Sequence, residues 1–105
     1  MKIYQSGSYS VKIYIAGAMN IIEQACREHV VKGLCVNIKP NKYIYTYGEE
    51  TGAEIELINY PKYPKSNEEI WVEAVCLGNK LMSALFCGSF TVMDGEKAIT
   101  YDRRI

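Results

Sequence analysis

Three tyrosines at alternate positions, Tyr43, Tyr45 and Tyr47, form the most distinctive group of reactive side chains in this sequence. Alternate residues of a β-strand point to the same face of a sheet, so the three phenols should share one face while Ile44 points to the other. Tyrosine combines a large rigid contact area with a polar tip. The spacing therefore predicts a surface that recognises a ligand or a partner.

Tyr14 and two glutamates should join these tyrosines. Tyr14 alternates with the apolar residues of residues 11–15, and Glu54 and Glu56 alternate with Ile55 and Leu57, so all three polar side chains should point away from the core. Paired carboxylates can bind a guanidinium, an ammonium or sugar hydroxyls, whereas the alternative interpretation is a solvated sheet surface. Carboxylate catalysis needs a desolvated cleft, which an exposed strand does not supply, so no catalytic residue is assigned.

Two neighbouring arginines lie at the end of the sequence, Arg103 and Arg104. Their guanidinium groups can clamp a phosphate or an acidic partner. The alternative is a charged tail without fixed structure.

The stretch KIYIAGAMN, residues 12–20, passes from a strand through Gly17 into a helix. Such a turn either cradles a phosphate or simply delivers the helix onto the sheet. The stretch resembles the opening of nucleoside 2-deoxyribosyltransferases, and that resemblance implies nucleotide or nucleoside chemistry at Gly17.

The hydrophobic pattern predicts two helices and six strands. One helix should begin at an Asn20 cap and stop at Gly33, and the other should begin with a Ser66–Glu69 capping box. The expected strands are residues 11–15, 34–38, 43–47, 53–58, 89–93 and 97–101, with a turn at residues 39–42.

The order of these elements predicts an α+β fold in a single domain, residues 1–105. A strand, a helix and a hairpin recur in residues 11–47 and 53–101. These duplicated β-α-β-β units should form one mainly antiparallel sheet with both helices on one face. The periodicity places the following residues in the core: Val11, Ile13, Ile15, Ile22, Val30, Leu34, Val36, Ile38, Ile44, Ile55, Leu57, Ile70, Leu77, Leu81 and Leu85.

Composition excludes several classes of function. Twelve basic residues balance twelve acidic ones, which disfavours nucleic-acid binding, and no apolar run is long enough for a bilayer. The four cysteines lack zinc spacing, so we expect free thiols, no metal and no cofactor. The first ten residues lack the pattern of a signal peptide, which favours a cytoplasmic protein.

Two further resemblances bear on function. The duplicated architecture resembles the modules of the GyrI-like family of small-molecule-binding proteins. Residues 33–64, GLCVNIKPNKYIYTYGEETGAEIELINYPKYP, look like small phage-encoded accessory proteins of unassigned role. That resemblance implies a product that blocks or sequesters a component of the host.

These observations lead to one preferred expectation and one alternative. We expect a non-enzymatic binding protein, a homodimer, that blocks a host defence protein in the manner of an anti-CRISPR protein or sequesters a small nucleotide-like signal. Its contact residues should be Tyr14, Tyr43, Tyr45, Tyr47, Glu54, Glu56, Arg103 and Arg104. The alternative is a small nucleotide- or nucleoside-processing enzyme that uses the Gly17 turn.

Overall fold

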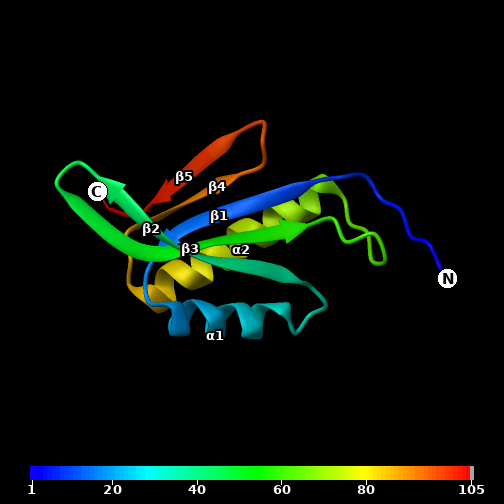
Figure 1. The fold of residues 1–105 in the computed structure, drawn as a ribbon, viewed down its shortest axis with the longest axis horizontal. Coiled ribbons are helices and arrows are strands. Elements are labelled where there is room, and N and C mark those ends of the chain that lie inside the picture. The colour runs from blue at the N-terminus through cyan, green and yellow to red at the C-terminus, as the bar shows by residue number, and fades with distance from the viewer. Residues whose placement is uncertain (105) are drawn as a thin grey trace.

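The protein, described here by a computed structural model over residues 1–104, contains five strands and two helices (Figure 1). In chain order these are β1 (Ser10–Ala16), α1 (Met19–Val30), β2 (Val36–Tyr45), β3 (Gly48–Ile58), α2 (Asn67–Leu85), β4 (Ser89–Met93) and β5 (Ala98–Asp102).

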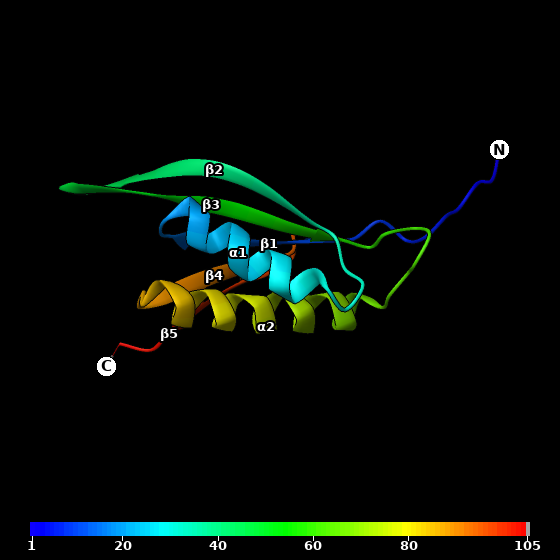
Figure 2. The same cartoon turned by 90° about the horizontal axis from the view of Figure 1, so that it is seen from below.

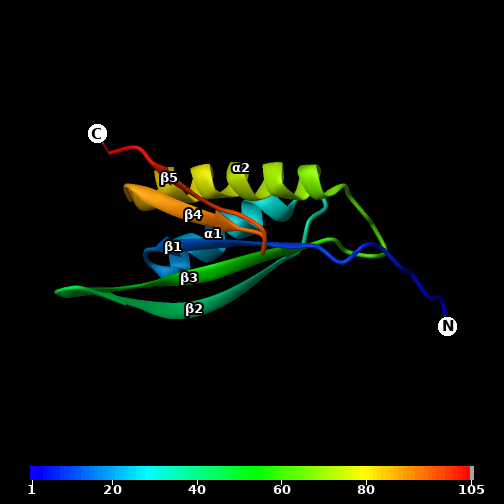
Figure 3. The same cartoon turned by 90° about the horizontal axis from the view of Figure 1, so that it is seen from above.

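One sheet with strand order β2-β3-β1-β4-β5 organises the molecule, and all four pairings are antiparallel. Both helices pack on the same face of this sheet, and the other face is uncovered (Figures 2 and 3). The predicted α+β class, with an antiparallel sheet and two helices on one face, is therefore confirmed.

The expected hairpin at residues 39–42 is absent. β2 is one strand from Val36 to Tyr45, and Pro40 lies within it opposite Ala53. β2 is an edge strand, where a proline that lacks an N–H group disrupts no ladder hydrogen bond. The prediction of six strands was therefore wrong, and so was the strand–helix–hairpin form of residues 11–47. The chain instead runs β-α-β twice, followed by β5.

The core lies between the sheet and the two helices. Most of the expected core residues are buried, but Ile44 is 80% exposed. The β2–β3 hairpin extends past the ends of both helices, so the face on which Ile44 lies has nothing to pack against it (Figure 2). The fully buried hydrophobic residues are Val11, Ile13, Ile15, Ile22, Cys26, Ala53, Ile55, Leu57, Ile70, Ala74, Leu77, Leu81, Phe90 and Val92.

The two helices begin differently. Helix α2 has the expected capping box, in which Ser66 accepts from the Glu69 backbone N–H and Glu69 accepts from the Ser66 backbone N–H. Helix α1 begins at Met19, and its N-cap is Ala18 rather than the expected Asn20. Backbone hydrogen bonds from residues 21 and 22 to the Ala18 carbonyl close its first turn.

Candidate functional site

A pair of polar residues lies at the centre of the uncovered sheet face. Tyr14 on β1 stands directly opposite Glu54 on β3, and the Tyr14 hydroxyl donates a hydrogen bond to Glu54 Oε1 at 3.0 Å. Burial, followed by this hydrogen bond, raises the pKa of Tyr14. Tyr14 is therefore a neutral donor at neutral pH. The sequence prediction that these two side chains share the open face is correct.

Glu54 is held as an ionised carboxylate. Its side chain is only 16% exposed, and two ammonium groups approach it, Lys12 at 3.4 Å and Lys39 at 3.8 Å. Burial opposes ionisation, but the Tyr14 hydrogen bond and the two lysines outweigh it, so the pKa of Glu54 lies below its usual value. The same pairing raises the pKa of Lys12.

Two further tyrosines extend this group along the β2–β3 hairpin. The Tyr43 hydroxyl donates to the Ala53 carbonyl at 2.7 Å, and the Tyr45 hydroxyl donates to Glu50 Oε1 at 2.8 Å. Burial raises the pKa of Tyr43. Both phenols are therefore fixed by hydrogen bonds, with their rings on the open face.

A hollow of about 290 Å³ lies among these side chains, and we call it the tyrosine hollow. It is bounded by β1, the β2–β3 hairpin, the start of β4 and the segment after β5. The residues that line it are Tyr14, Ile15, Ala16, Tyr43, Tyr45, Glu50, Cys87, Gly88, Ser89, Phe90, Thr91 and Arg104. Its volume is close to the lower end of the range for small-molecule sites. Its wall combines phenols, a carboxylate and a guanidinium.

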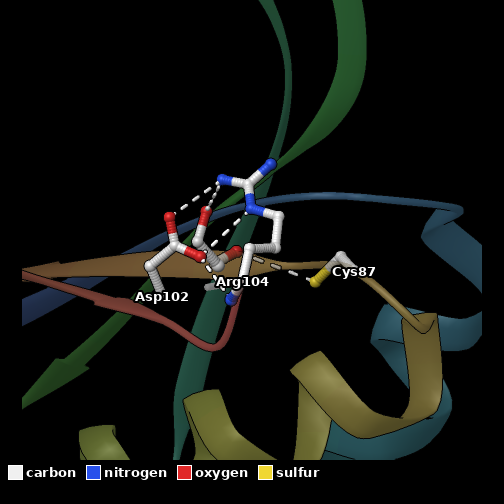
Figure 4. Close-up of polar contacts among 4 residues, drawn as sticks. Cys87, Asp102 and Arg104 are labelled. Atoms are coloured by element: carbon white, nitrogen blue, oxygen red, sulfur yellow. Dashed lines mark hydrogen bonds and ion pairs between the residues drawn. The ribbon is translucent and has the colours of Figure 1, made fainter.

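Arg104 has a fixed place at this hollow. Asp102 accepts hydrogen bonds from both the backbone and the side chain of Arg104 (Figure 4). The backbone N–H of the preceding residue donates to the Gly88 carbonyl. The interpretation of this segment as a tail without fixed structure was therefore wrong for Arg104.

Four of the expected contact residues do not line the hollow, and one of them, Glu54, lies beside it through its hydrogen bond with Tyr14. Tyr47 belongs to the turn between β2 and β3, is fully exposed and has a φ of 65°, so it does not share the strand face of the other tyrosines. Glu56 lies on the open face of β3, two residues beyond Glu54, but does not line the hollow. Arg103 also does not line it.

Sequence reasoning missed several residues of the hollow, of which Glu50 is the most informative. Glu50 falls between the strands expected at residues 43–47 and 53–58, yet β3 begins at Gly48, so Glu50 shares its face with Glu54. Glu50, Glu54 and Glu56 are separated by even numbers of residues, so alternation along the full length of β3 places all three on one face. Ser89 and Thr91, which also line the hollow, are two residues apart on β4 and therefore lie on one face of the sheet.

Gly17 is needed at the turn between β1 and α1 because α2 packs closely against it. A Cβ at this position would lie 2.5 Å from Leu85 Cδ2, and the Gly17 backbone N–H donates to the Thr51 carbonyl at 2.9 Å. The glycine therefore permits a close approach of α2 to the turn. This packing gives Gly17 a structural role, and its own backbone N–H is already paired with a carbonyl.

Two other surface features are less suited to a binding site. Lys62 and Lys65 lie in the loop at the end of the sheet opposite Arg103 and Arg104, so the four cations do not form one basic patch (Figure 1). A hollow of about 630 Å³ near Lys65 is larger but mainly apolar. The tyrosine hollow gathers more polar and aromatic groups from separate elements, so it is the better candidate site.

Three further findings concern the cysteines, possible metal ligands and the length of the helices. Cys26, Cys35, Cys76 and Cys87 are free thiols. Within residues 1–104, no three histidine, cysteine, aspartate or glutamate side chains converge as metal ligands. Neither helix in that part of the chain has the length and apolarity needed to cross a bilayer.

The fold has close counterparts among solved structures, although no protein-family model and no curated protein matches the sequence. A phage SAM lyase in complex with S-methyl-5'-thioadenosine superposes with a TM-score of 0.66 and 13% identity, covering 97% of this chain and 95% of the other. A phage SAM lyase in its apo state gives a TM-score of 0.68 and 13% identity, covering 97% and 94%. At this identity the likeness establishes the fold.

These neighbours correct the main functional expectation. Both are enzymes, which contradicts the prediction of a non-enzymatic binding protein and favours the enzyme alternative. Both are also phage proteins, in agreement with the resemblance of residues 33–64 to phage-encoded proteins.

Proposed function

We propose that the protein is a lyase that cleaves S-adenosylmethionine, or a closely related sulfonium nucleoside, at the tyrosine hollow. The observation that carries the proposal is the match of nearly the whole chain to a SAM lyase, one structure of which holds S-methyl-5'-thioadenosine. The composition of the hollow supports it independently, because aromatic rings and carboxylates are the groups that attract an organic cation.

The proposed reaction needs no water and no external reactant. The bond between the sulfonium sulfur and the γ-carbon of the amino acid breaks, and its electron pair stays on sulfur to give neutral S-methyl-5'-thioadenosine. The substrate's own carboxylate attacks that carbon and closes a lactone, while the ammonium group keeps the remaining positive charge. Because the leaving thioether is neutral, no general acid has to protonate it.

The protein's contribution would be binding and orientation. Glu54 is ionised and flanked by the Tyr14 hydroxyl, so it offers a fixed negative charge beside the hollow. The Tyr43 and Tyr45 rings provide faces for an adenine ring or for the sulfonium. A site that holds the substrate's carboxylate next to its γ-carbon fixes the reactive conformation in advance. This lowers the entropic part of the activation barrier and so raises the rate.

The phage source of both neighbours supports a narrower biological proposal. A phage-encoded lyase would antagonise host defence by consuming a small nucleoside metabolite. Such an activity keeps the expected host-directed role and the nucleotide-like ligand, with chemical destruction in place of sequestration.

The test is direct conversion of substrate by the purified protein. Incubation with S-adenosylmethionine should release S-methyl-5'-thioadenosine and homoserine lactone faster than a protein-free blank, as followed by chromatography. Glu54→Gln should lower the rate about tenfold or more, since a hydrogen bond to a charged group contributes about 1.5 to 3 kcal/mol. Glu56→Gln is the matched control and should leave the rate nearly unchanged.

The outcomes separate the activity from its location. Release of product at the blank rate by a folded protein would refute the lyase proposal. Turnover that survives Glu54→Gln, with an unchanged melting temperature, would keep the lyase but remove Glu54 from its site.

A further inference from the structure

Arg104 is unusually well anchored for a residue so near the end of the chain. Its backbone N–H and its Nε donate to Asp102 Oδ1 at 2.8 and 3.1 Å. Its Nη2 donates to Asp102 Oδ2 at 3.1 Å and to Ser89 Oγ at 3.3 Å. Two-pronged pairing of a guanidinium with a carboxylate fixes the plane of the guanidinium as well as its position. The side chain is therefore held in one orientation.

Gly88 contributes to this anchor. A Cβ at position 88 would lie 2.5 Å from both Cδ and Nε of Arg104, so the arginine stem rests on the bare backbone of the residue before β4. The neighbouring Arg103 backbone N–H donates to the Gly88 carbonyl at 2.9 Å. Any side chain at position 88 would displace the guanidinium.

One nitrogen of Arg104 is left for another partner. The guanidinium has five N–H groups, and those on Nε and Nη2 face Asp102 and Ser89. Among residues 1–104, Nη1 forms no hydrogen bond or ion pair, and it points away from Asp102 (Figure 4). Arg104 lines the tyrosine hollow, and its side chain is 69% exposed, so a ligand in the hollow can reach this donor.

The hollow has a positively charged residue on one side and a negatively charged residue on the other. Arg104 stands on the side of β4, whereas Glu50, which accepts from Tyr45, stands on the side of the β2–β3 hairpin. Glu54 adds a second carboxylate next to the hollow, beside Tyr14. A ligand with a carboxylate at one end and a cationic centre elsewhere matches this distribution of charge.

We propose that Arg104 binds the carboxylate of an α-amino acid group on the ligand, and that Asp102, Ser89 and Gly88 fix Arg104 for this purpose. The proposal rests on the proposed function, because it orients the amino acid end of a sulfonium nucleoside in the tyrosine hollow. The cationic centres of the ligand then lie toward Glu50 and Glu54.

Two uncleavable ligands separate this contact from the rest of the site. S-adenosylhomocysteine carries the amino acid carboxylate but no sulfonium, and S-methyl-5'-thioadenosine carries neither. Calorimetry should show that Arg104→Ala weakens binding of S-adenosylhomocysteine about tenfold or more, and that it changes binding of S-methyl-5'-thioadenosine less than about twofold. Arg103→Ala is the matched control and should change neither affinity.

A second variant tests the anchor itself. Asp102→Asn keeps the shape of residue 102 but weakens its hold on the guanidinium, so it should reduce the affinity for S-adenosylhomocysteine selectively, to a smaller extent than Arg104→Ala. Melting temperatures of all variants identify any that fail to fold.

The results distinguish the two proposals. If wild-type protein cleaves S-adenosylmethionine but Arg104→Ala and Asp102→Asn bind both ligands as the parent does, the role of Arg104 is refuted and the lyase stands. Equal weakening of both ligands assigns Arg104 a merely structural role and also refutes the proposal. Failure of the wild-type protein to bind S-adenosylhomocysteine also refutes the role of Arg104, whereas the cleavage assay with S-adenosylmethionine decides the lyase proposal by itself.

Discussion

The Tyr14 hydroxyl donates a hydrogen bond to Glu54 Oε1 across the β1–β3 pairing, at 3.0 Å. This contact helps to hold the pKa of Glu54 below its usual value. Tyr14→Phe removes the donor and should therefore raise the pKa of Glu54. The measurement is an NMR titration of the Glu54 side-chain carboxyl carbon, and an unchanged midpoint in Tyr14→Phe would contradict the assignment.

The same carboxylate predicts how stability depends on pH. A carboxyl group with a lowered folded-state pKa contributes stability above its unfolded pKa of about 4.3, and this contribution is lost as the pH falls through the folded-state pKa. Glu54→Gln removes the titrating group. The difference in unfolding free energy between wild type and Glu54→Gln should therefore shrink as the pH is lowered from about 7 to about 3, as measured by urea unfolding at each pH.

Local patterns were sufficient to predict most of the fold. Alternation in residues 11–15 and 53–58 gave the correct inward and outward faces of β1 and β3, and the Ser66–Glu69 box gave the start of α2. Pro40 produced the main error, because whether a proline ends a strand depends on whether the strand lies at the edge of the sheet. Edge position is a property of the whole topology, which residues 36–45 do not encode locally.

The candidate site was predicted only in part for a similar reason. Tyr14, Tyr43, Tyr45 and Glu54 were found because the alternation of each strand places them on the open face of the sheet. The remaining wall comes from Arg104 and the start of β4, which approach β1 only through the β1–β4 pairing. No spacing within a single element reveals that approach.

Replacing Gly78 in helix α2 should have two opposing effects on stability, one from helix propensity and one from packing. A Cβ at this position would overlap the ring of Phe90 on β4. Gly78→Ala gains about 1 kcal/mol of helix propensity, but overpacking of a core costs about 1 to 3 kcal/mol. The variant should therefore be less stable than wild type in urea unfolding.

Two comparisons check this explanation. Asn79→Ala, on the exposed side of the same helix, should be neutral or stabilising. Gly78→Ala should be better tolerated in a Phe90→Leu background, where the ring is gone. If Gly78→Ala proves stabilising in the wild-type background, the close contact between α2 and β4 is refuted.

His29, the chain's one histidine, is buried between the two helices. Lys80 Nζ lies 3.0 Å from His29 Nδ1, so Nδ1 accepts and Nε2 carries the proton, with Glu73 Oε2 at 3.5 Å. Burial, followed by the charges of Lys32 and Lys80, lowers the pKa of His29 from its usual 6.5, against the opposing effect of Glu73. The imidazole should therefore be neutral in the folded protein at neutral pH.

The sign of the resulting pH dependence follows from linkage. Below pH 6.5 His29 is protonated in the unfolded chain but stays neutral in the folded chain until its lower folded-state pKa is reached. The free energy of unfolding should therefore fall as the pH is lowered below 6.5. The imidazole signals in NMR should titrate below pH 6.5, and His29→Gln should flatten the stability profile below that pH. A midpoint above 6.5 would show that Glu73 controls the imidazole instead.

The expected homodimer is still a proposal, and the end of the β2–β3 hairpin offers a test of it. Ile44 and Tyr47 are 80% and 104% exposed there, and Tyr47 adopts a φ of 65°. This conformation is unfavourable for tyrosine, whereas asparagine tolerates it. A strained residue with no packing role in the subunit suits a contact with a second copy of the chain.

Tyr47→Asn should therefore act in opposite directions on folding and on association. The unfolding free energy of the isolated subunit should stay the same or rise slightly, because backbone strain is relieved. Self-association should weaken about tenfold or more, since removal of a buried interfacial tyrosine commonly costs about 2 kcal/mol. Sedimentation velocity over a concentration series gives the association constant, with Thr46→Ser as the neighbouring control. A wild-type chain that sediments as a monomer at every concentration would refute the dimer, and unchanged association of Tyr47→Asn would place its interface away from the hairpin end.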